Sequence, residues 1–352
     1  FVISTRTGMN DITTQALSGS VDISILLPVY NAEDTLAACL TSIARQSLAN
    51  WECLIINDGS TDQSSRIIAQ FAAKDPRFQV IQCEHRGIVP TLNEGLSHIQ
   101  SEFTARMDAD DIMRTHRLQE QLSYLRRHPL VAAVGSQVRI FPRQSMGQGI
   151  REYESWLNEM NEYHSIVRNA FVECPIAHPT LFIRTHELKS FGYRETSWTE
   201  DYDLVLRMLL DGKKIESVAK RLLAWRNGSQ RLSKVDSRCS IEQFLKCKAH
   251  YLCEGFLKLH RDYILWGYGK TGKQLAKELE RLGRYPKFIV DLHSGRIGNK
   301  ILGVPVVAPS AIDELPRMPL VVCVAREGPR TEARRILRVI GREELVDFVC
   351  AA

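Results

Sequence analysis

The sequence lacks three features that would have indicated a particular class of protein. No apolar run reaches the roughly 18 residues that a membrane-spanning helix needs, so no transmembrane segment is predicted. The nine cysteines include no C-x-x-C pair and are odd in number, which favours reduced cytoplasmic thiols over a zinc site or a disulfide framework. Charge is nearly balanced, at +5. This small excess of positive charge gives no reason to expect nucleic-acid binding, but it allows contact with phosphate-bearing substrates or an anionic membrane surface.

Strand and helix patterns alternate through the first part of the chain. Short apolar runs at 23–27, 51–57 and 78–81 predict buried strands, and apolar residues at helical spacing within 31–46 and 63–73 predict helices between them. Repeated units of this kind predict an α/β fold with a mostly parallel central sheet and flanking helices. Ligands of such sheets bind beyond the carboxyl ends of the strands, so polar residues at those ends are candidates for a site.

An acidic run with the sequence MDADD is the most informative stretch. It follows residues 101–106, which are predicted to form a short strand, and it contains Asp108, Asp110 and Asp111. Carboxylates so close together repel one another unless a cation lies between them, and hard oxygen ligands suit Mg²⁺ or Mn²⁺, which often bridge carboxylates to phosphates. The alternative is a solvated turn in which one Asp caps a helix that begins near Thr115. By itself, the run does not decide between the two.

Two further polar segments follow predicted strands. Asp58 begins a D-G-S turn at the end of the second strand, where a carboxylate can accept hydrogen bonds from a base or a ribose. After the third strand, the segment 86–95 contains Gly87, which permits close approach to the backbone, and Asn93, which offers an amide. Each signal is weak alone, since turns and loops are the ordinary places for such residues.

Five ordered motifs extend along the chain: LPVYN at 27–31, NDGSTD at 57–62, the segment 87–95, DADD at 108–111 and WTEDYDL at 198–204. Together they resemble the motifs of family 2 glycosyltransferases, whose nucleotide-sugar-binding domain has the GT-A fold. The resemblance covers about 21–233 and implies that fold there. One departure is Asn57, where the family usually has an Asp, and it leaves the preference for a nucleobase less defined.

The resemblance implies an inverting, metal-dependent transfer of a sugar from a nucleotide diphosphate sugar, with UDP-sugars favoured, to a hydroxyl group of a saccharide or lipid-linked acceptor. Such enzymes act in bacterial polysaccharide or glycoconjugate synthesis, which implies a cytoplasmic location with peripheral contact at the inner membrane. Asp110 and Asp108 are implied to bind Mn²⁺ or Mg²⁺, with Asp111 positioning Asp110 or binding through water. The residues implied to bind the donor nucleotide are Pro28, Tyr30, Asn31, Asp58, Gly87, Asn93, Asp108, Arg226 and Arg231.

The resemblance also implies which residue acts as the base. Asp201 aligns with the carboxylate that deprotonates the acceptor hydroxyl, and Glu200 is the alternative base, although acidic residues at a helix start are ordinarily capping residues. His178 is either an acceptor contact or a structural histidine. The rival function is a catalytically inactive regulatory protein that binds a nucleotide sugar. Since the carboxylate set from Asp58 to Asp201 is intact, the enzyme is favoured.

A second α/β unit is predicted near the C-terminus. A strand predicted at 263–266 leads into a G-x-G-x-x-G turn formed by Gly267, Gly269 and Gly272, and the next predicted strand ends at Asp291. This is the strand–turn–helix setting of nucleotide-binding loops. A resemblance to small Rossmann-like domains of sugar-modifying acyltransferases implies a nucleotide or nucleotide-sugar ligand. The alternatives are NAD(P), or a role in packing or homodimerisation alone.

The predicted organisation therefore has four parts. Residues 1–20 are a flexible N-terminal extension, 21–235 the GT-A domain, 236–261 a helical linker, and 262–352 a small Rossmann-like α/β domain. The expected partners are a nucleotide-sugar donor, a saccharide or lipid-linked acceptor and, in a homodimer, a second copy of the chain; no nucleic acid is expected.

Overall fold

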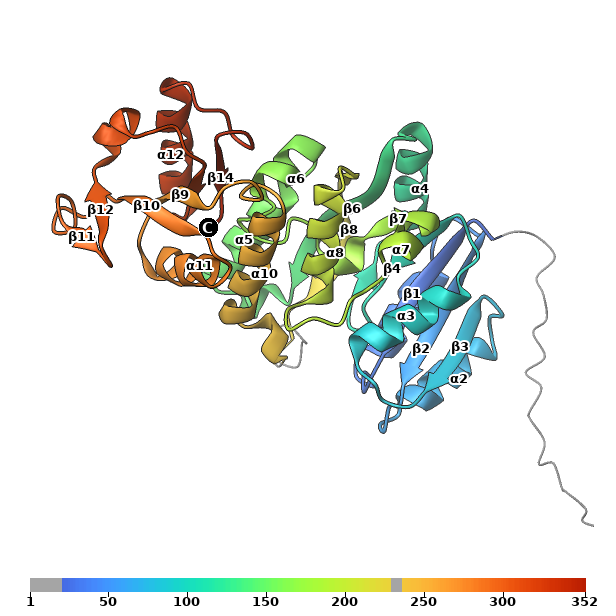
Figure 1. Ribbon diagram of the computed structural model, residues 1–352. Coiled ribbons are helices and arrows are strands. Elements are labelled where there is room, and N and C mark those ends of the chain that lie inside the picture. Colours follow the sequence, from blue (N-terminus) through green and yellow to red (C-terminus); the bar gives the residue numbers. More distant parts are fainter. Residues whose placement is uncertain (1–20, 229–235) are drawn as a thin grey trace, which may run out of the picture.

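The protein is built around two β-sheets with helices between them (Figure 1). The computed structural model describes residues 21–228 and 236–352, so the predicted extension at 1–20 lies outside the described residues. Within these ranges the larger sheet has eight strands and the smaller has six. The strands of the larger sheet, from one edge to the other, are β3 (Phe78–Cys83), β2 (Trp51–Asp58), β1 (Ile23–Val29), β4 (Phe103–Arg106), β7 (Phe182–Arg184), β6 (Val131–Phe141), β8 (Lys214–Arg226) and β5 (Ile112–Met113).

The larger sheet is mostly parallel. β3, β2, β1 and β4 pair in parallel, and so do β6 and β8. β7 runs antiparallel to both β4 and β6, and β5 runs antiparallel to β8. The predicted α/β class is confirmed, and the carboxyl ends of β1, β2 and β4 lie along one edge of the sheet.

β1 and β2 form strands because their sequences are apolar on both faces. All seven residues of β1 are buried, as expected for a parallel strand covered by helices on each side. The helix predicted over 31–46 begins only at Leu36. Asn31 cannot be part of the helix, because its φ of 46° lies in the left-handed region, and its Oδ1 accepts a hydrogen bond from the amide of Thr61 at 2.8 Å.

Close packing of helix α3 (Ile88–His98) on the sheet depends on Gly95. A Cβ there would lie 2.4 Å from Leu26 Cδ1 and 2.5 Å from Ile56 Cδ1. In the second half of the sheet, strand β7 begins at Phe182, shortly after a 3-10 turn at residues 178–180. The helices of this unit are α1 (Leu36–Ala44), α2 (Ser64–Ala72), α3 (Ile88–His98), α4 (Arg117–Arg127), α5 (Gln148–Asn158), α6 (Tyr163–Asn169), α7 (Thr185–Phe191) and α8 (Glu200–Leu210).

The smaller sheet has the strand order β11-β12-β10-β9-β13-β14. Apart from antiparallel β11, its strands are parallel and follow the order 3-2-1-4-5 of a Rossmann sheet. No helix in the described part of the chain is both long and apolar enough to cross a membrane. The elements of this region are α10 (Ile241–Glu254), β9 (Asp262–Trp266), α11 (Lys270–Arg281), β10 (Tyr285–Val290), β11 (Lys300–Ile301), β12 (Val304–Val307), β13 (Leu320–Val322), α12 (Glu327–Val339) and β14 (Phe348–Cys350).

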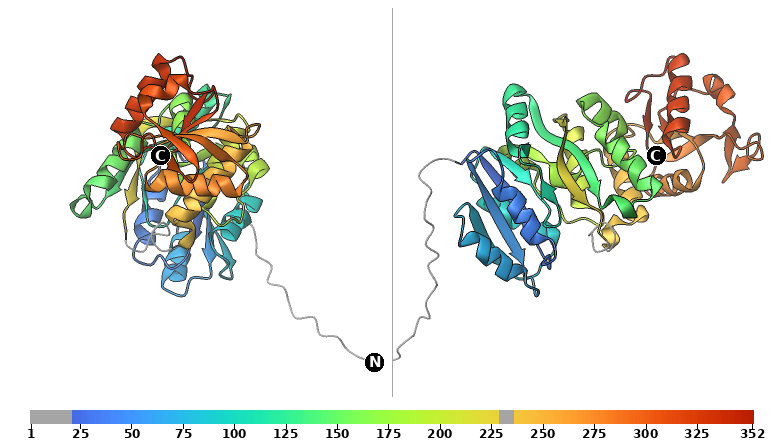
Figure 2. Two further views of the ribbon diagram at one scale, coloured as in Figure 1. Left: turned by 60° about the vertical axis from the view of Figure 1, so that its left-hand side comes forward. Right: turned by 180° about the vertical axis from the view of Figure 1, so that it is seen from behind.

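One hydrophobic cluster joins the two sheets. It includes Leu204 of α8 and Leu252 of α10, both fully buried. Lys248 of α10 is 2% exposed and donates from Nζ to the carbonyl oxygens of Val172 at 2.8 Å and Ala351 at 3.0 Å. Figure 2 shows the smaller sheet at one end of an elongated molecule. The predicted linker thus contains a helix with one buried face, and the division into domains stays a prediction.

Two glycines of the G-x-G-x-x-G turn are required by packing. Gly267 has a φ of 97°, and a Cβ there would lie 2.6 Å from the carbonyl oxygen of Cys323. A Cβ at Gly272 would lie 2.0 Å from the carbonyl oxygen of Gly267. At Gly269, in contrast, a Cβ would meet no neighbouring atom of the described chain within 4 Å. The turn after β9 therefore packs directly against the start of α11.

We expect Gly272→Ala to lower the free energy of unfolding by about 2 kcal/mol, because backbone atoms cannot move aside as a side chain can. The control is Gly328→Ala in α12, where a Cβ meets nothing within 4 Å in the described structure. It should be neutral or stabilising by up to about 1 kcal/mol. Urea unfolding measures both, and equal stabilities of the two variants would contradict the packing role.

Candidate active site

A cavity of about 540 Å³ lies beyond the carboxyl ends of β1, β2 and β4. Its lining also includes the loop after β3 and the end of β8. His85, Asp236 and Arg238 contribute to it, although sequence reasoning missed them. The predicted residues that line the cavity are Pro28, Tyr30, Asn31, Asp58, Gly87, Asp108, Asp110 and Arg226.

Asp58 holds the loop after β3 in place. Its carboxylate accepts hydrogen bonds from the amides of Arg86 at 2.9 Å and Gly87 at 3.0 Å, and His85 Nδ1 lies 2.9 Å from it. Gly87 follows this path with a φ of 90°, which glycine adopts without strain. The carboxylate predicted to contact a base therefore also anchors the cavity wall.

Tyr30 and His85 form a flat aromatic face at the cavity. Their rings stack with centroids 3.9 Å apart and an interplanar angle of 17°. Tyr30 is 46% exposed, so this face is accessible. A sequence signal for His85 did exist, because it directly precedes the segment 86–95, which was predicted to lie near the ligand.

Asn93 does not line the cavity in the described structure. Its Nδ2 donates to the carbonyl oxygen of Tyr193 at 2.8 Å, and its Oδ1 accepts from the amide of Tyr193 at 3.1 Å. These bonds tie α3 to the loop before α8. The structure gives Asn93 a role in holding that loop, and its contact with the donor stays a prediction.

The acidic run forms a turn in which three carboxylates converge. One oxygen each of Asp108, Asp110 and Asp111 lies within 4.8 Å of the others, which fits a hard divalent cation such as Mg²⁺ or Mn²⁺. The backbone amide of Arg226 donates to Asp111 Oδ1 at 2.7 Å, and its Nε donates to the carbonyl oxygen of Asp110 at 2.7 Å. Capping by an Asp is not observed: α4 begins after His116, and no side chain in the described ranges caps it.

Two buried guanidinium groups lie behind this turn, and neither was predicted. Arg106 is 4% exposed and forms an ion pair with Asp108. Arg117 is fully buried and donates to the carbonyl oxygen of Arg106 at 2.9 Å and to Gln121 Oε1 at 2.9 Å. Burial lowers the pKa of Arg117 to about 9, so it remains charged at neutral pH. These charges reduce the repulsion among the carboxylates.

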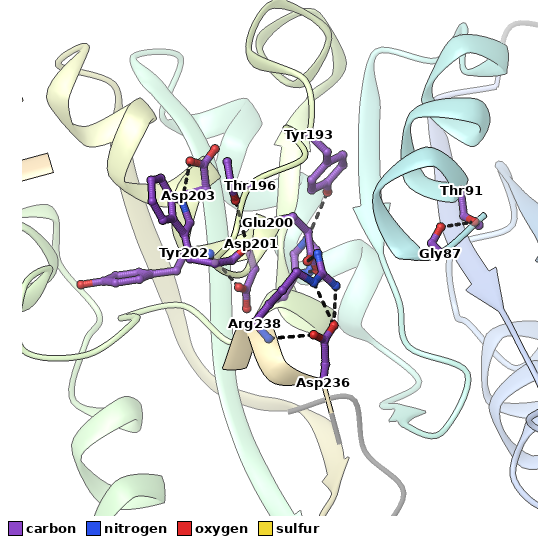
Figure 3. A network of polar contacts seen from close by, with 12 residues as sticks. Gly87, Thr91, Tyr193, Thr196, Glu200, Asp201, Tyr202, Asp203, Asp236 and Arg238 are labelled. Atoms are coloured by element: carbon purple, nitrogen blue, oxygen red, sulfur yellow. Dashed lines mark hydrogen bonds and ion pairs between the residues drawn. The ribbon is translucent and has the colours of Figure 1, made fainter. Parts of the chain in front are cut away.

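Glu200 and Asp201 lie together at the start of α8 (Figure 3). Glu200 is 6% exposed, and its Oε2 lies 3.3 Å from Arg238 Nη1. Burial, and then the charge of Asp201, raises the pKa of Glu200 to about 7. Asp201 is half-buried and accepts a hydrogen bond from the amide of Tyr202 at 2.7 Å. Near neutral pH, Glu200 is therefore partly protonated beside Asp201.

A buried network fixes the start of α8. The Asp203 carboxylate accepts hydrogen bonds from Trp198 Nε1 at 3.0 Å, from Arg207 Nε at 2.7 Å and from the hydroxyl of Tyr251 in α10. Two of these partners, Trp198 and Tyr251, lie outside α8. The first turn of the helix is therefore held to neighbouring segments. This positions Asp201 as well.

Arg238 connects the cavity with Glu200. Its Nε and Nη2 donate to Asp236 Oδ2 at 2.9 and 2.6 Å, while Nη1 faces Glu200 (Figure 3). Asp236 and Arg238 both line the cavity. The sequence signal that could have found these two residues is the Asp-x-Arg pair in the polar stretch after β8. Arg231, which was predicted to bind the donor, lies outside the described residues.

His178 lies beneath Glu200 and does not line the cavity in the described structure. Its Nε2 is 3.1 Å from the hydroxyl oxygen of Tyr193, and its Nδ1 is 3.9 Å from Glu200 Oε1. Burial, and then the charge of Arg106, lowers the pKa of His178 well below its ordinary value, so the ring is neutral at neutral pH. This environment suits the structural alternative, and the acceptor contact stays a prediction.

Asp291, at the end of β10, is engaged by its own loop. Its carboxylate accepts hydrogen bonds from the amides of Tyr268 at 3.3 Å and His293 at 2.9 Å and from Arg296 Nη1 at 2.8 Å. With two of the three motif glycines also required by packing, the loop has structural reasons for its sequence. Binding of a nucleotide or of NAD(P) at Gly267, Gly269, Gly272 and Asp291 stays a prediction.

Comparison with known proteins assigns the family. Residues 24–188 match Glycosyl transferase family 2. The putative glycosyltransferase EpsE of Bacillus subtilis (strain 168) is 32% identical over 196 residues, which are 54% of this chain and 67% of EpsE. The chain belongs to glycosyl transferase family 2. This glycosyltransferase also resembles UDP-Glc:alpha-D-GlcNAc-diphosphoundecaprenol beta-1,3-glucosyltransferase WfgD of Escherichia coli, at 27% identity over 190 residues, 54% of this chain and 70% of WfgD.

The fold of the glycosyltransferase is shared with S. aureus TarS (residues 1–349). The crystal structure of TarS in complex with UDP-GlcNAc aligns with a TM-score of 0.52 and 18% identity, over 74% of this chain and 72% of that chain. At this identity the likeness shows the fold alone. The family match ends before Glu200 and Asp201, so their roles depend on geometry.

We expect Glu200→Gln to stabilise the glycosyltransferase more at pH 8 than at pH 5.5. The folded protein holds the Glu200 proton more tightly than the unfolded chain does, so stability falls as pH rises from the ordinary pKa of 4.5 to about 7. This loss is complete above pH 7. The glutamine amide does not ionise, so this loss of stability is absent in Glu200→Gln. The gain in the free energy of unfolding should differ between the two pH values by on the order of 2 kcal/mol.

Urea unfolding at both pH values measures the effect. The matched control is Asp211→Asn at the other end of α8, where the side chain is 62% exposed. It should show no such pH dependence. An equal gain for Glu200→Gln at both pH values would mean that Glu200 does not retain its proton as the structure indicates.

Proposed function

We propose that this glycosyltransferase moves a sugar from a nucleotide diphosphate sugar to a hydroxyl group, with inversion and with a divalent metal ion bound. UDP-sugars are the favoured donors. The observation that carries the proposal is that one cavity contains an aromatic face, the acidic turn and Arg238, which reaches Glu200 at the start of α8. These features supply a surface for the nucleobase, a place for the diphosphate and a carboxylate on the acceptor side.

The stacked rings of Tyr30 and His85 suit the flat face of a nucleobase. Asp58 lies beside them, and a carboxylate has enough lone pairs to accept a base N–H in addition to its loop contacts. Support for uracil comes from the UDP-GlcNAc in the TarS crystal structure and from the UDP-Glc donor in the name of WfgD.

Asp110 and Asp108 would hold Mn²⁺ or Mg²⁺, since the converging carboxylates fit a hard cation. When bound, the ion supplies positive charge to the departing nucleotide diphosphate. Arg226 and Arg238 line the same cavity and provide fixed charge for phosphate oxygens. Asp111 accepts from the amide of Arg226 and so keeps the turn against the end of β8.

Asp201 is the proposed general base. The acceptor oxygen attacks the anomeric carbon, the bond from that carbon to the diphosphate oxygen breaks, and the hydroxyl proton passes to the Asp201 carboxylate. A base on the face opposite the leaving group makes this a single displacement with inversion. Glu200 is the alternative base, because its carboxyl group adjoins Asp201 and is held by Arg238.

The proposed acceptor is a saccharide or a lipid-linked saccharide in bacterial polysaccharide or glycoconjugate synthesis. The name of WfgD describes a lipid diphosphate acceptor and supports this class. The charge of +5 suits peripheral contact with an anionic inner-membrane surface. An inactive regulatory protein that binds a nucleotide sugar would have no need of a general base, so the presence of Asp201 favours the enzyme over that rival.

We expect Asp201→Asn to lower the kcat of sugar transfer by about 10²–10⁴-fold, the usual contribution of a general base, with the Kd for UDP within about twofold of wild type. Release of UDP measures transfer, and calorimetry measures UDP binding. Asp211→Asn, directly after the end of the same helix, is the control and should transfer normally. Turnover near wild type in Asp201→Asn would mean that another group is the base.

We expect Asp110→Asn to weaken binding of Mn²⁺ by about tenfold or more, because a direct carboxylate ligand is lost. Electron paramagnetic resonance can follow Mn²⁺ titration without donor or acceptor. The control is Asp34→Asn, which changes an acidic residue of the same cavity outside the three-carboxylate group. Unchanged Mn²⁺ affinity in Asp110→Asn would remove Asp110 from the ligand set.

A further inference from the structure

A second cleft, of about 940 Å³, lies between α5 and the start of α12. Among the described residues it shares no lining residue with the donor cavity. One wall belongs to the larger-sheet unit, and the other, formed by Arg326, Glu327 and Arg330, to the smaller-sheet unit. Figures 1 and 2 show α5 and α6 beside that smaller unit. Sequence reasoning assigned no function to any residue of this cleft.

The walls have the chemistry of a carbohydrate site. Tyr153 and Trp156 of α5 line one side of the cleft; both are half-buried, and their rings lie 6.0 Å apart at an angle of 23°. Exposed carboxylates at Glu152 and Glu327 and the exposed guanidinium of Arg326 supply acceptors and donors for hydroxyl groups. Small-molecule sites combine aromatic surface with a few polar groups in this way, and a sugar ring offers an apolar face together with hydroxyls.

Arg330 adds a buried donor to the cleft. It is 5% exposed, and its Nη1 donates to the carbonyl oxygen of Ala352 at 2.9 Å. Its Nε has no hydrogen-bond partner among the described residues. With Arg326 it offsets much of the charge of the three glutamates in the walls. A neutral, hydroxyl-rich ligand fits such a cleft better than a chain of phosphates, which requires a clear excess of positive charge.

Glu173 connects this cleft with the proposed catalytic carboxylates. It lines the cleft, and its pKa is raised mainly by burial, with a contribution in the same direction from the charge of Asp201. Such a contribution requires the two carboxyl groups to lie near each other. Only five positions separate Glu173 from His178 beneath Glu200, a span of at most roughly 18 Å. Glu173 therefore gives the cleft a wall in the segment that leads to His178, which lies next to Glu200.

We propose that this cleft is an acceptor subsite, which holds the sugar units of an oligosaccharide acceptor beyond the unit that carries the reacting hydroxyl. The inference rests on the proposed function and specifies its acceptor. A ring packs against Tyr153 and Trp156, while Glu327 binds hydroxyls from the opposite wall. The smaller-sheet unit is then part of the acceptor site, and the 2.6 Å ion pair of Arg168 with Glu344 helps to hold the two walls together.

Gly149→Trp tests this proposal. Gly149 is the second residue of α5 and lines the cleft, and a Cβ there meets nothing within 4 Å in the described structure, so an indole can fill the cleft without displacing the core. The matched control is Gly328→Trp, the second residue of α12, with equally open surroundings but outside the lining. Glu327→Ala is a second change that leaves the cleft open. Thermal unfolding verifies that all three variants fold.

The probe is an array of defined mono- to tetrasaccharides, read with the full chain in the presence of UDP and Mn²⁺, and donor hydrolysis is measured separately. We expect the wild-type chain to bind one or more oligosaccharides. Gly149→Trp should weaken that binding by about tenfold or more and Glu327→Ala by a smaller factor, while Gly328→Trp leaves it unchanged. Donor hydrolysis should be the same in all four proteins.

Two results would overturn the subsite. One is equal oligosaccharide binding by the two Trp variants, and the other is a wild-type chain that hydrolyses donor but binds no oligosaccharide on the array. A wild-type chain that neither binds UDP nor hydrolyses any nucleotide sugar would instead contradict the proposed function itself, and the subsite with it.

Discussion

The arrangement of the site depends on the balance of charge at the carboxyl end of the parallel sheet. Three carboxylates converge after β4, and such a group destabilises the fold unless positive charge lies close to it. Arg106 and Arg117 supply that charge from the buried side. Arg226 binds the turn from the end of β8. The acidic turn, the ends of β1 and β2 and the end of β8 are thereby brought around one cavity.

The same constraint appears at the start of α8. Glu200 is buried beside Asp201, and burial makes the carboxylate form of Glu200 unfavourable. Arg238 lies next to it and also binds Asp236, so one cation contacts both a carboxylate that lines the cavity and the buried carboxyl group at the start of α8. The network around Asp203 fixes this helix to α10, and a side chain held on a packed helix, such as the proposed base Asp201, keeps its position better than one on a free loop.

The smaller sheet has the strand order of a nucleotide-binding fold, yet its motif residues are engaged in packing and in loop structure. Gly272 is required by the approach of α11 to the turn after β9, and the Asp291 carboxylate is surrounded by donors of its own loop. This unit shares a hydrophobic cluster with the larger-sheet unit. Its position beside α5 accounts for the second cleft, to which each unit contributes one wall.

The local features of this protein can be predicted from the order of its residues: the buried strands β1 and β2 from their continuous apolar runs, the α/β class, the acidic run and the acidic start of α8. The sequence could not show that His85 stacks on Tyr30, that Asn93 holds Tyr193, that Arg117 lies beneath the acidic turn, or that Arg238 reaches Glu200. Apolar periodicity and turn chemistry act between residues that are near neighbours in the chain. The structures that they produce can therefore be predicted from the sequence. Which polar side chains meet is decided by sheet order and helix packing, because these place segments side by side that lie tens of residues apart.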